Sequence, residues 1–246
     1  MKTLLFILIL ALTIPGSFKD NQKRYARVRQ AYAEKGAIVE KLLSDNGINT
    51  KNLRIYLQAF KSEKKIELWA KNKTDQSYKL ITEFDICAIS GDLGPKRQQG
   101  DGQIPEGFYK INIFNPASNF YLSLGTNYPN KSDRILGVKG DLGGDIFIHG
   151  NCVTIGCMPI TDDKIKELYI FCVEARDNGQ QTIPVTIFPA KLTDTNFKTL
   201  IAKYHGDNDK TNLWGDLKVA YDYFTKNKKL PVITFLDNGR HKISTD

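Results

Sequence analysis

The sequence of 246 residues predicts an α+β protein. Its body is a mostly antiparallel β-sandwich or barrel-like structure, with an N-terminal helix before it and a C-terminal helical region after it. Two observations predict this class. Apolar residues recur at helical spacing near both ends, whereas residues 51–190 contain short runs rich in β-branched and aromatic side chains. Clusters of Gly, Pro, Asn and Asp separate these runs, which is typical of strands joined by turns.

Residues 1–17 have the pattern of a secretory signal peptide. Lys2 precedes the apolar run Leu4–Ile14, which is too short to cross a bilayer as a helix. The small residues Gly16 and Ser17 offer a cleavage site, although the usual small-x-small pattern is missing. A retained membrane anchor is therefore the alternative. In both cases we expect the rest of the chain to be exported from the cytoplasm.

Residues 18–50 predict an N-terminal helical segment. Apolar residues between Asn21 and Asn46 recur at roughly helical spacing, and Gly47 stops the run. The apolar positions are Tyr25, Val28, Tyr32, Ile38, Val39, Leu42 and Leu43.

Within residues 51–190, strands are predicted at "LRIYLQAF", "KIELWAK", "YKLITEFDICAIS", "GFYKINIF", "DIFIHG" and "TIPVTIFPA". One helix interrupts them. Thr161 can cap its start, Asp162 and Asp163 favour its N-terminal dipole, and Gly179 ends it. Its apolar face consists of Ile165, Leu168, Tyr169 and Cys172.

Residues 191–246 predict C-terminal helices and a hairpin that pack on the body. The helical region covers about residues 195–228. The hairpin "LPVITFLDNGRHKI" turns at Asn238-Gly239, a dipeptide typical of tight β-turns.

The net charge of +8 is concentrated at the two ends of the chain. Residues 19–41 contain 7 basic and 3 acidic side chains, and residues 226–242 contain 5 and 1, so the remainder is neutral. No helix-turn-helix, zinc-finger or aromatic RNA-binding motif accompanies the charge, so we expect no nucleic-acid partner. The basic ends are expected either to be solvated or to make peripheral contact with an anionic envelope surface.

His149 and Cys157 are the candidate catalytic residues. A thiol nucleophile needs a base within reach and backbone N–H groups for the developing oxyanion, and a strand end followed by a tight glycine-containing loop can supply both. The residues leave alternatives open: a coincidental pair, a Cys152–Cys157 disulfide, or a zinc site that also uses Cys152. Cys87 and Cys172 are expected to be small buried apolar residues.

The other two histidines, His205 and His241, are expected on the surface because they stand in polar surroundings.

Three segments together resemble the L,D-transpeptidase (YkuD-like) family, with most similarity to its YafK-like, murein-acting branch. They are "IHGNCVTIGCMPITD", "GPKRQQGDGQIPEGFYKI" and "NFYLSLGTNYPN". The resemblance covers roughly residues 50–190, and the later "YDYFTKNKKLPVI" is also similar. It implies the family's catalytic domain over residues 51–190.

The resemblance assigns roles to individual residues. Cys157 is the nucleophile, His149 the base, the carbonyl of Gly150 orients the imidazole, and the amides of Gly156 and Cys157 hold the oxyanion. Four residues in matching motifs are expected to bind substrate: Lys96, Asn127, Tyr128 and Thr154. The chain departs from better-known members at Ile155, where they have a second histidine, and at Pro159, where they have an arginine. These departures affect the expected mode of substrate binding and the choice of acceptor.

The resemblance implies cysteine-dependent acyl transfer on peptidoglycan stem peptides through a thioester, in cell-wall cross-linking or remodelling, without metal or cofactor. The alternative is a hydrolytic murein amidase or peptidase that uses water as acceptor. A non-catalytic cell-wall peptide-binding protein is a third reading. A periplasmic or envelope-associated location follows, and no specific protein partner is expected.

Overall fold

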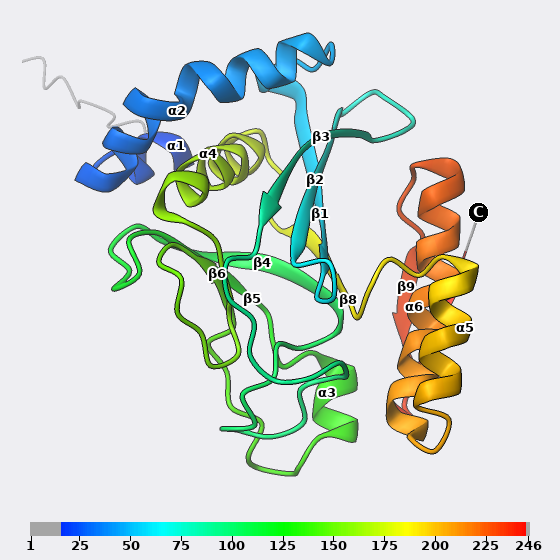
Figure 1. Ribbon diagram of the computed structural model, residues 1–246. Helices are drawn as coiled ribbons and strands as arrows, with labels where there is room; N and C mark the ends of the chain where they lie inside the picture. Colours follow the sequence, from blue (N-terminus) through cyan, green and yellow to red (C-terminus); the bar gives the residue numbers. More distant parts are fainter. Residues whose placement is uncertain (1–15, 245–246) are drawn as a thin grey trace, which may run out of the picture.

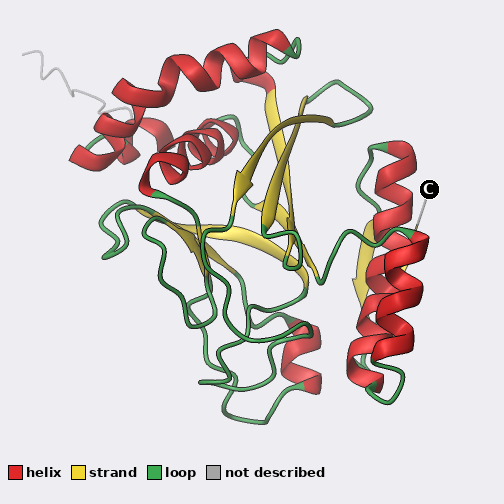
Figure 2. Ribbon diagram, viewed as in Figure 1, coloured by secondary structure: helices red, strands yellow, loops and turns green. Residues whose placement is uncertain are grey.

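The centre of the fold is a single, strongly curled sheet of eight strands. A computed structural model describes residues 16–244 (Figure 1). The strand order is β3-β2-β1-β8-β4-β5-β6-β7, and neighbours are antiparallel except for the parallel pairs β1–β8 and β6–β7. The strands are β1 (Leu53–Phe60), β2 (Lys65–Asn72), β3 (Lys79–Asp85), β4 (Gly107–Asn115), β5 (Ser123–Thr126), β6 (Phe147–His149), β7 (Met158–Pro159) and β8 (Ile183–Phe188). Helices lie before and after this sheet in the chain, which confirms the α+β class (Figure 2).

The N-terminal helical segment consists of two helices, α1 (Phe18–Gln22) and α2 (Ala26–Asp45), rather than one. The Ser17 hydroxyl accepts a hydrogen bond from the Asp20 N–H at the start of α1, and the extended backbone of Tyr25 separates the helices. The helical spacing of apolar residues continues across Tyr25, so the sequence pattern did not predict a break between two helices. Val28, Ala31, Val39 and Leu43 of α2 are buried, whereas Ile38, predicted on the same stripe, is 43% exposed.

Helix α4 (Asp162–Asp177) packs between α2 and the sheet. The Thr161 hydroxyl accepts a hydrogen bond from the Lys164 N–H, as the sequence predicts. The predicted apolar face is fully buried, and the chain leaves the helix at Gly179 with φ +85°. A short 3₁₀ turn (Thr50–Asn52) and helix α3 (Lys131–Leu136) complete the body.

The C-terminal region forms helices α5 (Asp194–Lys203) and α6 (Asn208–Asn227) and the hairpin of β9 (Val232–Phe235) and β10 (His241–Ser244). The predicted helical region is therefore split by the turn at residues 204–207. Gly239 has φ +80° in the hairpin loop, where a glycine was predicted. In Figure 1 this region stands beside the curled sheet.

The two faces of the sheet bury different parts of the chain. On β4, Tyr109 and Ile111 enter the main core with α4, whereas Phe108 joins a second apolar cluster with Leu217 and Trp214 of α6. The Trp214 Nε1–H donates to the buried carboxylate of Glu106, 2.6 Å away, which fixes α6 to the body. We call the face that carries Phe108 the outer face.

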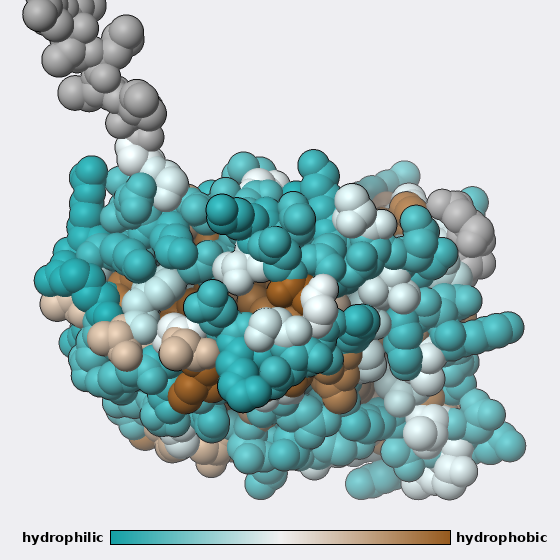
Figure 3. Space-filling model, turned by 90° about the horizontal axis from the view of Figure 1, so that it is seen from above, coloured by the Kyte–Doolittle hydropathy of each residue, from teal (hydrophilic) through white to brown (hydrophobic). Residues whose placement is uncertain are grey.

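Some basic side chains of the N-terminal helices interact with other parts of the protein rather than with solvent. Arg27 donates to the carbonyls of Ser118 and Tyr121, and Lys35 lies 2.7 Å from Asp163. Seen from above, the surface of the molecule is largely hydrophilic (Figure 3).

The predicted signal segment lies outside the described residues apart from Gly16 and Ser17. Among residues 16–244, no helix has the length and apolar character needed to cross a bilayer.

Candidate functional site

His149 ends β6 and is buried, with only 2% of its surface exposed. Its Nδ1 lies 2.5 Å from the carbonyl oxygen of Gly150. Since a carbonyl can only accept, Nδ1 carries the proton and Nε2 is left as the basic nitrogen. The ring of Phe120 lies over the imidazole at a centroid distance of 4.6 Å. These contacts hold the imidazole in one orientation.

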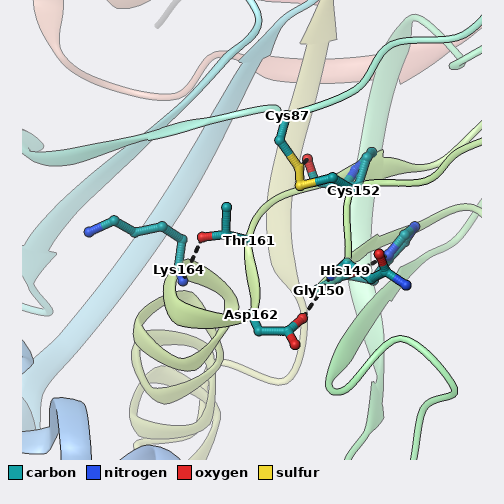
Figure 4. Close-up of a disulfide and its surroundings, with 9 residues drawn as sticks. Cys87, His149, Gly150, Cys152, Thr161, Asp162 and Lys164 are labelled. Atoms are coloured by element: carbon teal, nitrogen blue, oxygen red, sulfur yellow. Dashed lines mark hydrogen bonds between the residues drawn. A yellow bond between two sulfur atoms is a disulfide. The ribbon is translucent and has the colours of Figure 1, made fainter.

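The turn after His149 requires a glycine. A Cβ on Gly150 would lie 2.8 Å from the carbonyl oxygen of Phe120 and would also meet the carboxylate of Asp162. That carboxylate accepts a hydrogen bond from the Asn151 N–H at 2.8 Å (Figure 4). Asp162, at the start of α4, therefore anchors the turn whose carbonyl positions the imidazole.

Cys157 is a free, half-buried thiol immediately before β7. Its Sγ accepts a hydrogen bond from the Phe147 N–H and donates to the carbonyl of Asp145, both at 3.4 Å. Within residues 16–244 its backbone N–H makes no hydrogen bond, and none joins the thiol to His149. The residue before it, Gly156, has φ +139°, which favours glycine. A Cβ at this position would lie only 3.2 Å from the carbonyl oxygen of Gln103.

One cavity of about 320 Å³ brings His149 and Cys157 together. It opens on the outer face. Asn115, Ser123 and His149 are paired across β4, β5 and β6 and so share one face. The register shift between Ile111 and Ile113 reverses the alternation of β4, so Phe114 packs on the main core and Asn115 lies on the same face as Phe108. Its remaining lining residues are Ser118, Asn119, Phe120, Asp145 and Phe147. Sequence reasoning did not single out these residues. For two of them, Asn115 and Ser123, the alternation of polar and apolar residues along the strands could have indicated their place on this face.

Burial sets the protonation of both candidate residues. It lowers the pKa of His149 below its ordinary 6.5, against the opposing effect of the Gly150 carbonyl. Burial also raises the pKa of the Cys157 thiol, and the nearby Asp145 carboxylate adds to the rise, while the Phe147 N–H and Lys96 oppose it. Both shifts favour the neutral pair, a thiol and a neutral imidazole in one cavity, over a thiolate–imidazolium pair.

The structure corrects two expectations about the cysteines. Cys87 and Cys152 form a disulfide with their Cα atoms 5.5 Å apart (Figure 4). Cys87 is therefore not a plain buried apolar residue, and the Cys152–Cys157 bridge is wrong. Cys152 is also unavailable to zinc, and the described residues contain no cluster of His, Cys, Asp or Glu suited to a metal ion. Cys172 is free and fully buried, as predicted.

The sequence did not predict this disulfide, because its two cysteines are 65 residues apart in the chain. Cys87 reaches the loop because its N–H donates to the carbonyl of Pro159 in β7, 3.0 Å away. The bridge ties the segment after β3 to the loop between His149 and Cys157.

The four residues expected to bind substrate do not line the cavity of Cys157. Lys96 is buried and pairs with Asp101 at 2.5 Å. The hydroxyl of Tyr128 donates to the carbonyl of Leu142 at 3.0 Å, and burial raises its pKa. Thr154 accepts from the Gly156 N–H at 3.1 Å and donates to the Cys157 carbonyl at 2.8 Å.

Asn127 lies elsewhere on the outer face, where its side-chain oxygen accepts from the Lys110 N–H at 2.7 Å. The Gly156 amide, expected to hold the oxyanion, is thus occupied by Thr154, whereas that of Cys157 is not. The structure brings together Cys157, His149 and the Gly150 carbonyl. The expected substrate residues lie outside the cavity, although Thr154 hydrogen-bonds the backbone of Cys157.

The expectation for His241 is wrong. It is buried, and its backbone N–H donates to the Asp216 carboxylate at 2.9 Å. The expectation was based on its polar sequence neighbours, such as Arg240 and Asp237, which do not indicate that α6 packs over it. His205 is exposed, as expected.

Comparisons with known proteins agree on one family. The model of the L,D-transpeptidase catalytic domain, YkuD, matches residues 54–187. The Escherichia coli K12 protein named "Putative L,D-transpeptidase YafK" is 37% identical over 192 residues, which cover 77% of this chain and 74% of that protein. The protein of the same name from E. coli O157:H7 is equally similar.

Two solved structures are more distantly similar. The helical cell shape determining protein Pgp2 from Campylobacter jejuni is 18% identical with a TM-score of 0.44, over 81% of this chain and 80% of that one. Bd1075 of Bdellovibrio bacteriovorus is 19% identical with a TM-score of 0.40, over 74% and 76%.

Proposed function

The chain belongs to the L,D-transpeptidase catalytic domain family, and from this premise we propose that it performs cysteine-dependent acyl transfer on peptidoglycan stem peptides in the cell envelope. Membership of the family supports a cell-wall enzyme. The observation that carries the proposed chemistry is the cavity shared by the free thiol of Cys157 and the buried imidazole of His149.

In the proposed reaction, Nε2 of His149 takes the proton of the Cys157 thiol as Sγ attacks a stem-peptide carbonyl. The neutral resting pair is suited to this, because the base is unprotonated and the proton moves as the C–S bond forms. The unpaired N–H of Cys157 stabilises the oxyanion, and the N–H of Gly156 joins it if it leaves the Thr154 hydroxyl. The C–N bond then breaks, the leaving amine takes the proton from His149, and a thioester remains.

The acceptor decides the outcome. An amine from a second peptide attacks the thioester to form a cross-link, whereas water releases the acid. Ile155 stands where other family members have a second histidine, and its exposed aliphatic side chain can neither orient nor deprotonate a peptide amine. Water, which needs no binding site for a second peptide, is then the competing acceptor, and hydrolysis by a murein amidase or peptidase is the second candidate function.

The test uses purified sacculi and the variant Cys157→Ala. We expect the variant to lose product formation by more than about 10³-fold, because no other described thiol lines the cavity. Cys172→Ala is the matched control, since it removes a buried thiol that does not line the cavity, and it should keep its activity. Mass spectrometry of the products separates new cross-links from liberated amines or stem peptides. Full activity in Cys157→Ala would sink the proposal.

A further inference from the structure

A second and larger cavity, of about 720 Å³, lies on the same outer face as the thiol. It is enclosed by β4 and β8 on one side and by α6 and the C-terminal hairpin on the other. Its walls are mainly apolar, and they include Phe108, Pro184, Leu230, Ile233 and Phe235. On its floor the hydroxyl of Tyr56 donates to that of Thr186 at 2.9 Å.

One rim of this cavity is basic. Lys110 of β4 and Lys131 and Arg134 of α3 all line it. Lys131 pairs with Asp237 at 2.7 Å, but Lys110 and Arg134 have no carboxylate partner within residues 16–244. Beside them, Asn127 uses its side-chain oxygen on the Lys110 N–H, which leaves its amide hydrogens for another acceptor. The rim thus presents two unpaired cations and a hydrogen-bond donor above an apolar chamber.

Strand β4 connects this rim to the thiol. Lys110 lines the larger cavity and Asn115 lines the cavity of Cys157. Five residues of strand span roughly 17 Å, and slightly less where the register shifts between Ile111 and Ile113. Between them the outer face is open, because Asn112 is exposed and Ile113 is 46% exposed. An extended peptide of about five residues covers this distance.

We propose that the larger cavity is a distal subsite that binds an acidic, partly apolar peptide arm of the substrate. The reacting carbonyl lies at Cys157, the arm runs along β4, and its carboxylates meet Lys110 and Arg134. Its apolar part enters the chamber between the sheet and the hairpin. The inference rests on the proposed function for the identity of the substrate, but the subsite is defined by its own residues. It makes the C-terminal region part of the binding surface.

The test measures binding separately from turnover. In a Cys157→Ala background, the fluorescently labelled probes are a cross-linked disaccharide-tetrapeptide dimer, which can span both cavities, and the disaccharide-tetrapeptide monomer. The variant Lys110→Glu/Arg134→Glu should weaken binding of the dimer on the order of tenfold and reduce its advantage over the monomer. The matched control is Lys198→Glu/Lys226→Glu, which makes the same charge change on exposed residues of α5 and α6. It should change dimer binding less than about twofold.

Equal losses in the two double variants would show general electrostatic attraction and overturn the subsite. An unchanged affinity in Lys110→Glu/Arg134→Glu would do the same. Binding of phosphatidylglycerol vesicles that depends on Lys110 and Arg134, without any effect on the dimer, would instead assign the rim to a membrane surface. These readouts are independent of the Cys157→Ala turnover assay, so failure of the subsite and failure of the proposed function are distinguishable. Circular dichroism checks that each variant is folded.

Discussion

At the scale of single residues, burial and one backbone contact set the protonation of His149, the proposed base. The Gly150 carbonyl holds the proton on Nδ1, and burial keeps the ring neutral at neutral pH. A neutral imidazole and a protonated thiol in one cavity suit general-base attack, and they do not suit a preformed thiolate.

The lowered pKa of His149 predicts the pH dependence of activity. Protonation of Nε2 removes the base, so kcat/KM should fall as the pH decreases through a value below 6.5. The activity is therefore retained down to a lower pH than an exposed histidine would permit. The measurement is kcat/KM from pH 4 to 9 on a stem-peptide substrate. A half-maximal point above 6.5 would contradict the assignment.

Thiol reactivity gives a second test at this scale. Cys157 should react with iodoacetamide faster than Cys172, because Cys172 is fully buried and burial raises its pKa strongly. Cys87 and Cys152 are bonded to each other and should not react without a reductant. The rate at Cys157 should rise with pH, since its pKa is raised, and should decrease in His149→Ala. Equal labelling of Cys157 and Cys172, read by peptide mass, speaks against an activated pair.

At the scale of elements, Asp216 links the C-terminal hairpin to α6. Its carboxylate accepts hydrogen bonds from Arg240 and from the backbone and side chain of His241. Burial alone would raise its pKa, but the hydrogen bonds from His241 and then Arg240 lower it to about 2. The ordinary value is 3.8, so the folded state favours the ionised form.

Asp216→Asn should therefore destabilise the protein by about 2 kcal/mol at pH 7. The depressed pKa stabilises the fold above pH 4, and this contribution is lost as the pH falls from about 4 to about 2. The difference between wild type and variant should shrink over the same range. Urea unfolding at several pH values measures it. Asp222→Asn, an exposed change on the same helix, is the control, and a loss of equal size there would refute the link.

At the scale of the whole molecule, the Cys87–Cys152 disulfide closes a loop of 65 residues that includes β4, β5, α3 and β6. Restricting the unfolded chain in this way stabilises a protein by about 3–4 kcal/mol. The bridge also attaches the loop that carries Cys157 to a distant segment of the chain.

Reduction should lower the thermal stability of the protein. The variant Cys87→Ser/Cys152→Ser should have a lower Tm and show no further decrease with dithiothreitol, whereas Cys157→Ala should keep the full reductant-dependent decrease. Differential scanning calorimetry with and without reductant measures this. Equal response of the two variants would mean that the bridge does not stabilise the fold.

Local patterns in the sequence predicted much of the fold. The run "LRIYLQAF" is the whole of β1, Thr161 caps α4, and the hairpin turns where Asn238-Gly239 predicted it. These features depend on alternation, capping and turn chemistry between residues close in the chain. The break between α1 and α2 was missed because apolar periodicity continues across it.

The sequence by itself determined the order of helices and strands, the family motifs, and the pairing of His149 with Cys157 as candidates. Only the tertiary structure decided which side chains share a cavity. It placed Lys96 and Tyr128 in buried contacts outside the cavity of the thiol, joined Cys87 to Cys152, and covered His241 with α6. The spacing of residue types along the chain reflects local preferences for helix, strand or turn, whereas these contacts join segments tens of residues apart. They exist because the curled sheet brings those segments together as it buries its two faces.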